Sequence, residues 1–159
     1  MAQSELIIIV FDHLEDAFWA RRALALMCAQ HVFRLEHAAE ITRDRTGQTM
    51  LHPHMALPAY PHLPHTRMPS LLSNAIFSPG TKDKHDALAE AGLDPFFLES
   101  VSQALAPNCS ALLFFVPHAG HDVVLPALLN VMGLLNGTLH RTSVPWELER
   151  FLLSHVQMF

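Results

Sequence analysis

Apolar and polar positions divide the chain into two segments that share one plan. Residues 6–11 form a continuous apolar run rich in β-branched residues, which is typical of a strand buried on both faces. Residues 111–116 form a second run of this kind. A helical pattern and then a mixed strand follow each run, over about 12–31 and 35–42 in the first segment and about 122–135 and 138–142 in the second. The sequence therefore predicts a strand–helix–strand unit that occurs twice.

Two such units predict a ferredoxin-like α+β fold. With right-handed crossovers they interleave as a four-stranded antiparallel sheet with the helices on one face. We expect the two fully apolar strands in the centre of this sheet and the two mixed strands at its edges. In the first unit, Asp12 is expected to cap the helix, with Glu15 in capping-box position and Arg22 facing solvent. The expected buried stripe of that helix is Ala17, Ala20, Leu24 and Cys28.

A proline- and histidine-rich connector lies between the two units. Residues 53–80 hold six of the eleven prolines, a density that is incompatible with regular structure over most of the segment. Before it, residues 49–52 are expected to pair back as a short hairpin arm. After it, we expect a helix over 81–91, a second helix opened by Asp94-Pro95, and a C-terminal helix opened by Pro145. Residues 1–159 are thus expected to form a single domain.

The charge composition narrows the choice of partners. Charged residues make up 16% of the chain, below the usual share, which suggests that another chain covers part of the surface. The net charge is −5 with histidine neutral and no basic stripe is present, so we expect no nucleic-acid partner. No apolar run approaches about 18 residues, so we expect no transmembrane span. Residues 1–5 are polar and do not resemble a secretory leader, so we expect a cytoplasmic protein.

The twelve histidines are the unusual feature of the composition. Four of them form two pairs in or beside the connector, His52 with His54 and His62 with His65. Neutral imidazole is a common ligand of zinc, nickel and copper, and two pairs at these spacings can converge on one ion. The competing interpretation is a proline-rich connector whose histidines are solvated or packed on the sheet.

A second candidate site lies where strands lead into helices. Asp12 and His13 follow the first apolar run, and His118 and His121 follow the second. A helix N-terminus at such a junction can hold an anion, and strand-end loops are common ligand sites. The competing interpretation is a helix cap with exposed histidines.

The connector also carries too many apolar side chains to be left in water. They dock either on the open face of their own sheet or on a partner chain, because a sheet with helices on one side needs cover on the other. We expect homo-oligomerisation through that face. The candidate interface residues are Leu57, Tyr60, Leu63, Leu71, Leu72, Ile76 and Phe77.

Two long stretches carry a family resemblance. They include LIIIVFD and RLEHAAEITRDRTGQTMLH within residues 6–52, and GLDPFFLESVSQALAPNCSALLFFV and GTLHRTSVPWELERFLL within residues 92–153. These stretches resemble the bacterial domain-of-unknown-function family number 1269, described as a predicted membrane protein. The resemblance implies a ferredoxin-like α+β domain with no established enzymatic activity, and it implies no catalytic residues. The Gly- and Ala-rich hydrophobic hairpin of that family is replaced here by residues 53–80.

No catalytic motif is recognisable in the sequence. Ser110 and Ser143 lack a nucleophile-elbow setting, Cys28 and Cys109 have no electropositive neighbours in sequence, and no glycine-rich loop cradles a phosphate. We therefore expect a non-enzymatic, homo-oligomeric module with a regulatory or stress-linked role. The alternatives are a histidine-based protein that binds or senses zinc or nickel, and a small-molecule or peripheral-membrane binder.

Overall fold

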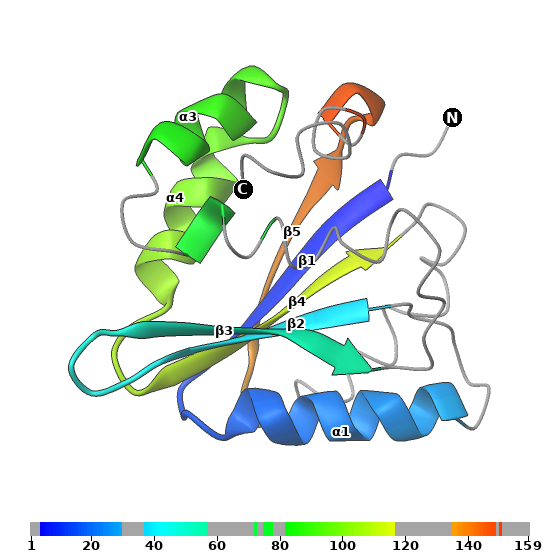
Figure 1. Ribbon diagram of the computed structural model, residues 1–159, viewed down its shortest axis with the longest axis vertical. Helices are drawn as coiled ribbons and strands as arrows, with labels where there is room; N and C mark the ends of the chain where they lie inside the picture. Colours follow the sequence, from blue (N-terminus) through cyan, green and yellow to red (C-terminus); the bar gives the residue numbers. More distant parts are fainter. Residues whose placement is uncertain are drawn as a thin grey trace.

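The computed structural model describes residues 4–29, 37–56, 72, 75–77, 82–116, 135–148 and 150. These residues form an α+β structure in which five strands make one antiparallel sheet, in the order β3-β2-β4-β1-β5 (Figure 1). The strands are β1 (Ser4–Phe11), β2 (His37–Arg43), β3 (Thr49–Ala56), β4 (Cys109–Val116) and β5 (Thr138–Val144). The helices are α1 (Asp16–Ala29), α3 (Lys82–Glu90) and α4 (Pro95–Ala104).

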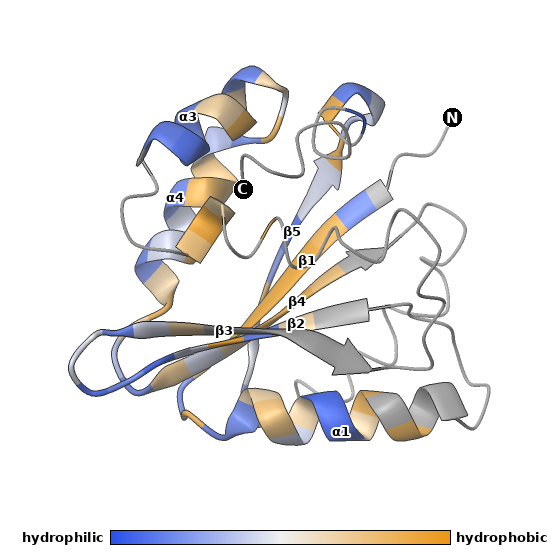
Figure 2. Cartoon of the chain, viewed as in Figure 1, coloured by the Kyte–Doolittle hydropathy of each residue, from blue (hydrophilic) through white to orange (hydrophobic). Residues whose placement is uncertain are grey.

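The two fully apolar strands pair with each other inside the sheet. β1 runs antiparallel to β4, with Glu5 opposite Val116 at one end and Phe11 opposite Ser110 at the other. β5 pairs with the other side of β1, and β2 with the other side of β4. The side chain of Ile8 is fully buried, as expected for a strand covered on both faces. The predicted pairing of the two apolar runs is confirmed, and both appear as orange strands in Figure 2.

The sheet has five strands where four were predicted, because the hairpin arm after β2 is longer than the pattern indicated. β3 continues past residue 52 to Ala56 and pairs along β2. β3 therefore forms one border of the sheet, and the prediction that β2 lies at an edge is wrong. The opposite border is β5, the mixed strand of the second unit, which was predicted to lie at an edge.

β3 includes a proline, although the prolines from residue 53 onward were predicted to exclude regular structure. Glu40 pairs with His52 and Ala38 pairs with Met55, so β3 has one more residue than β2 between these two pairs. The extra residue is a β-bulge, and Pro53 lies within it. A border strand tolerates proline at a bulge, because the missing N–H is not needed for a ladder hydrogen bond there.

Helices cover both faces of the sheet. The predicted common face for the helices of the two units stays a prediction, because the second of these helices lies outside the described residues except at residue 135. On one face α1 buries Ala17, Ala20 and Leu24. On the other face, β1 and β4 contribute Ile8 and Leu113 to a core that also contains residues of α3, α4 and 72–77. Figure 1 shows α1 below the sheet and α3 with α4 above it. Two layers of helix are needed because both faces of β1 and β4 are apolar.

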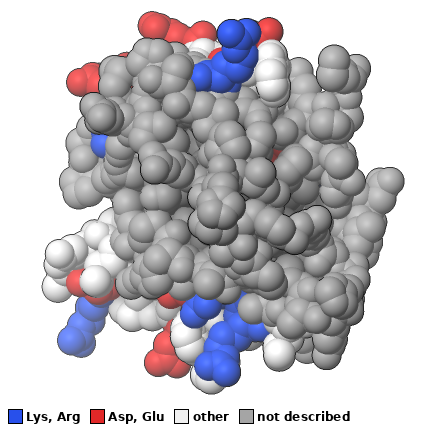
Figure 3. Space-filling view, turned by 45° about the vertical axis from the view of Figure 1, so that its right-hand side comes forward, with Lys and Arg blue, Asp and Glu red and all other residues white. Residues whose placement is uncertain are grey.

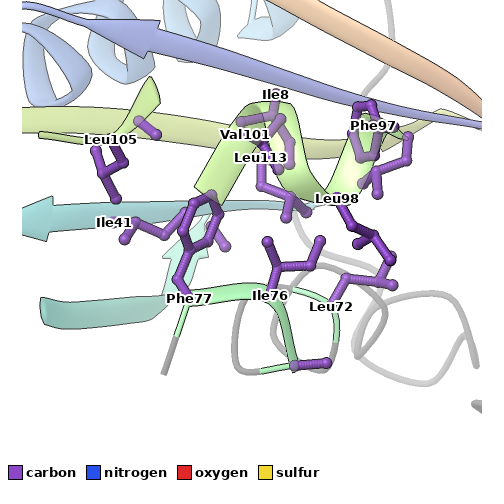
Figure 4. Packing of buried hydrophobic residues seen from close by; sticks show 14 of the residues in the cluster. Ile8, Ile41, Leu72, Ile76, Phe77, Phe97, Leu98, Val101, Leu105 and Leu113 are labelled. Atoms are coloured by element: carbon purple, nitrogen blue, oxygen red, sulfur yellow. The ribbon is translucent and has the colours of Figure 1, made fainter. Parts of the chain in front are cut away.

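Part of the connector belongs to this second layer. Leu72, Ile76 and Phe77 are 0%, 1% and 3% exposed. Figure 4 shows their side chains pointing into the cluster formed with the sheet and α4. The ring nitrogen Nε2 of His85 in α3 lies 2.9 Å from the carbonyl oxygen of Ile76 and connects the segment to that helix. Of the two interpretations of the connector, docking on its own sheet fits these residues, and little of their surface is left for a partner.

Local signals predicted some element boundaries well. Asp94 caps α4, its Oδ1 accepting a hydrogen bond from the amide of Phe96 at 2.9 Å, and Pro95 occupies the first turn as predicted. Gly92, which follows α3, has φ +115°, a conformation that glycine adopts readily. The predicted helix over about 122–135 lies outside the described residues except at its end. Residues 146–148 are helical, as predicted for the C-terminal helix.

The turn between β2 and β3 is organised by one carboxylate. Asp44 Oδ1 accepts hydrogen bonds from the Thr46 hydroxyl at 2.6 Å, the Thr46 amide at 2.9 Å and the Gln48 amide at 3.0 Å. These bonds, that of the Thr46 hydroxyl first, lower the pKa of Asp44 below its ordinary value of 3.8. Gly47 has φ +88° and supplies a left-handed position in this turn.

Candidate functional site

The connection from β1 to α1 differs from the predicted helix cap. α1 begins at Asp16, four residues after the predicted cap at Asp12, and residues 12–15 form a bend and turn. The hydroxyl of Ser110 in β4 donates to the carbonyl of His13 at 2.6 Å and accepts from the amide of Ala17 at 3.1 Å. The first free amide of the helix is thus satisfied from the sheet, and the side chains of Asp12 and Glu15 remain exposed.

An open depression of about 500 Å³ lies beside this connection. Three carboxylates, one imidazole and an exposed tryptophan dominate its lining. The lining residues are Asp12, His13, Leu14, Glu15, Asp16, Trp19 and Asn108. Asn108 has φ +63°, and its amide donates to the carbonyl of Arg43 at 2.8 Å, which fixes this part of the rim to β2. The depression suits a cationic group or an apolar side chain, since Leu14 and Trp19 leave apolar surface uncovered there.

The outer face of α1 adjoins the depression and shares two of its residues. Glu15, at the end of the connection, and Trp19, Arg22 and Leu26 on the helix are all exposed, and they follow one another at intervals of four, three and four positions. That spacing places them on one line along a helix. Trp19 is 53% exposed and Leu26 is 64% exposed. We name these four residues the outer stripe of α1.

The two neighbouring arginines of α1 have different roles. The Nε of Arg21 lies 3.3 Å from Oε1 of Glu40, a largely buried carboxylate on β2. This ion pair holds Arg21 against the sheet, because a buried carboxylate left without its partner is strongly destabilising. The guanidinium groups of both arginines lie over the Phe18 ring, at 5.3 Å for Arg21 and 5.7 Å for Arg22, and that of Arg22 also lies 6.0 Å from the Trp19 ring centroid. Among the described residues, no carboxylate forms an ion pair with Arg22.

Positively and negatively charged side chains lie beside each other on the side of the molecule that α1 occupies. Figure 3 shows Lys or Arg side chains beside Asp or Glu side chains along the lower border, at the height that α1 occupies in Figure 1. The outer stripe carries one charge of each sign, Glu15 and Arg22, with Trp19 between them. Exposed surfaces that combine tryptophan and arginine are typical of the centre of protein interfaces more than of small-molecule sites.

The second predicted site is brought together in part. Asp12 and His13 both line the depression. His118 and His121 lie outside the described residues, but the chain leaves β4 at Val116, which pairs with Glu5 at the far end of β1 from Asp12. The two strand-to-helix junctions therefore start from opposite ends of the sheet, as antiparallel pairing of β1 and β4 requires.

The predicted histidine metal site is not assembled by the described residues. His52 and His54 both belong to β3 and lie on either side of Pro53 in the bulge. His62 and His65 lie outside the described residues. Within the described ranges, no group of three or more histidine, cysteine, aspartate or glutamate side chains is placed to hold a metal ion. Zinc or nickel binding stays a prediction.

Some of the candidate interface residues lie within the described part of the chain and others lie outside it. Leu72, Ile76 and Phe77 belong to the core of the chain itself. Leu57, Tyr60, Leu63 and Leu71 lie outside the described residues, so their predicted role stays a prediction. The exposed apolar residues Trp19 and Leu26 were not identified from the sequence. The signal that points to them is their position opposite the buried stripe of Ala17, Ala20 and Leu24.

Comparison of the chain with protein-family models, curated proteins and solved structures found no match. The resemblance to family number 1269 therefore stays a prediction. No helix within the described residues has the length and apolar character needed to cross a membrane.

Proposed function

We propose that the chain is a non-enzymatic module of ferredoxin-like type that acts by associating with further copies of itself. The strand order β2-β4-β1-β5 supports the ferredoxin-like assignment, because two interleaved strand–helix–strand units produce this order with every neighbouring pair antiparallel. β3 is then an added border strand. Residues 72 and 75–77, together with α3 and α4, cover the face that such a sheet otherwise leaves open.

The observation that carries self-association is the outer stripe of α1. Its two apolar members, Trp19 and Leu26, are both more than half exposed although the opposite side of the same helix is fully buried. Large apolar side chains that share one exposed face favour a protein partner. The low share of charged residues in the chain points in the same direction.

The proposed interface for self-association is α1, in place of the connector that was expected from the sequence. The connector residues 72 and 75–77 are used inside the chain. The depression is open and lined largely by carboxylates and an imidazole, and it lacks the enclosed apolar walls that usually surround a small molecule. A second protein surface fits such an open site better than a small ligand does.

Sedimentation velocity of the untagged protein tests this proposal. Between about 1 and 300 µM, the weight-average sedimentation coefficient is expected to rise from that of a monomer toward that of a dimer. Trp19→Ser is expected to move this rise to higher concentration. Phe96→Ser is the matched control, because Phe96 is also a large aromatic residue, 79% exposed, in α4 on the opposite layer. A monomer at every concentration contradicts the proposal.

A further inference from the structure

We infer that two copies of the chain pair through their α1 helices, antiparallel to each other, about a twofold axis that passes between the levels of Phe18 and Trp19. This inference rests on the proposed self-association and specifies its surface and geometry. It follows from the order of the residues in the outer stripe, from their charges and from the position of the depression.

The order of the stripe disfavours a parallel arrangement of the two helices. Along α1 the exposed residues run acid, aromatic, base, aliphatic: Glu15, Trp19, Arg22 and Leu26. Parallel pairing about a twofold axis along the helices places Arg22 beside Arg22 and Glu15 beside Glu15. Like charges brought together across an interface are costly, so this register is disfavoured.

Antiparallel pairing matches each charge with its opposite. When Glu15 of one copy lies opposite Arg22 of the second copy, the twofold axis produces the same pair again with the copies exchanged. The axis then passes midway between residues 15 and 22. At about 1.5 Å of helix rise per residue, the two Trp19 side chains lie within about 1.5 Å of the same level, next to the axis. Two tryptophans at the centre and two ion pairs flanking them form a self-complementary surface.

In this register, a side chain of the second copy lies in the depression. Leu26 of one copy lies level with the position four residues before Glu15 of the other copy. That position is about 6 Å beyond Glu15 along the axis of α1. The depression lined by Asp12, His13 and Leu14 lies at that end of α1. Leu14 is 36% exposed and supplies an apolar contact for the incoming leucine. The occupant of the depression is therefore the Leu26 side chain of the second copy.

The association is expected to be weak. One pair of helices and two small depressions bury less than the roughly 1,000 Å² that stable complexes usually exceed. We therefore expect a dissociation constant in the micromolar range, which sedimentation can measure.

Charge exchange between positions 15 and 22 tests the geometry. Arg22→Glu places a carboxylate opposite Glu15 in both pairs of the dimer, and Glu15→Arg places a guanidinium group opposite Arg22 in both pairs. Each single variant is expected to weaken dimerisation at least about tenfold. The double variant Glu15→Arg/Arg22→Glu restores both pairs with their signs exchanged, and its dissociation constant is expected within about threefold of the native one. An equimolar mixture of the two single variants is expected to form a heterodimer that is tighter than either homodimer.

Control variants distinguish a wrong pairing of the α1 helices from misfolding and from a lack of self-association. Glu90→Arg reverses an exposed charge on α3, in the other helix layer, and is expected to leave the dissociation constant unchanged. Melting temperatures of all variants show whether each one folds. If the native chain dimerises and both single variants dimerise equally well, this α1 pairing is wrong while self-association stands. If the native chain stays monomeric, the proposed function itself fails.

Discussion

The side-chain oxygen of Ser110 lies 3.1 Å from the amide nitrogen of Ala17 and accepts its hydrogen bond across 93 positions of sequence. The same hydroxyl donates to the carbonyl of His13, and the serine is fully buried. A residue of β4 therefore caps α1 and holds the connection that lines the depression. The position of the residues that line the depression therefore depends on the central strand pair, β1 and β4.

Ser110→Ala is expected to lower the free energy of unfolding by about 1–2 kcal/mol, because it leaves the Ala17 amide and the His13 carbonyl without their partner. Urea unfolding at neutral pH measures the change. Ser100→Ala, at an exposed position of α4, is the matched control and is expected to change the free energy by about 0.5 kcal/mol or less. Equal effects of the two substitutions contradict the capping role.

The histidine of β5 opposite Ile8 provides a pH-dependent prediction. The Nε2 atom of His140 is buried and has no hydrogen-bond partner, and burial lowers the pKa of this residue below its ordinary value of 6.5. Below that pH the unfolded chain takes up a proton that the folded chain does not, so the contribution of His140 to stability falls as the pH falls. His140→Leu is expected to raise the free energy of unfolding by about 1 kcal/mol at pH 7.5, and by more at pH 5.

His140→Gln separates the two causes, since glutamine keeps a polar group in place and does not titrate. It is expected to share the weaker pH dependence of His140→Leu without the gain at pH 7.5. Urea unfolding of the three proteins at both pH values gives the comparison. Parallel pH profiles for native protein and both variants contradict the assignment to His140.

The turn carboxylate predicts a second pH effect at lower pH. The pKa of Asp44 is lowered in the folded chain, so its stabilising contribution is complete above the ordinary value of 3.8 and is lost as the pH falls through the folded value. Asp44→Asn is expected to destabilise the protein at pH 5 and to do so less at pH 3. The difference in urea midpoint between variant and native protein measures this. A difference that does not shrink at pH 3 assigns the effect to geometry and contradicts the role of the charge.

The elements that the sequence predicted correctly are those whose cause is local. Residues 6–11 and 111–114 are buried, as the apolar composition of the two runs predicted. Asp94 and Pro95 form a helix start from adjacent residues. The start of α1 was missed because its cap, Ser110, comes from a distant strand. The extension of β3 through Pro53 was missed because a proline is tolerated only where one side of the strand is free.

The candidate site shows the same division. Asp12 and His13 follow a predicted strand, and the structure places them in the depression. The apolar residues of the connector were predicted to need cover, but hydrophobicity does not say whether the cover is the chain itself or a partner. For Leu72, Ile76 and Phe77 it is the chain itself. Trp19 could have been found from the sequence, since it lies opposite the buried stripe that was predicted for its helix.

The close approach of Gly137 to β1 leads to the last prediction. A Cβ atom at this position would lie 2.6 Å from Cγ2 of Ile9 and 2.8 Å from Cε1 of Phe11, both well inside van der Waals contact. Glycine therefore allows the chain to enter β5 next to β1. Gly137→Ala is expected to lower the free energy of unfolding by about 1–3 kcal/mol through overpacking, as measured by urea unfolding.

A double-mutant cycle with Ile9→Ala tests the cause of that loss. Ile9→Ala removes the Cγ2 atom and creates a cavity, so alone it is destabilising. If the clash is the cause, the added methyl group of Gly137→Ala occupies part of that cavity, and the double variant is more stable than the sum of the two losses predicts. Strictly additive losses would assign the effect of Gly137→Ala to the backbone at the start of β5 instead of to its contact with β1.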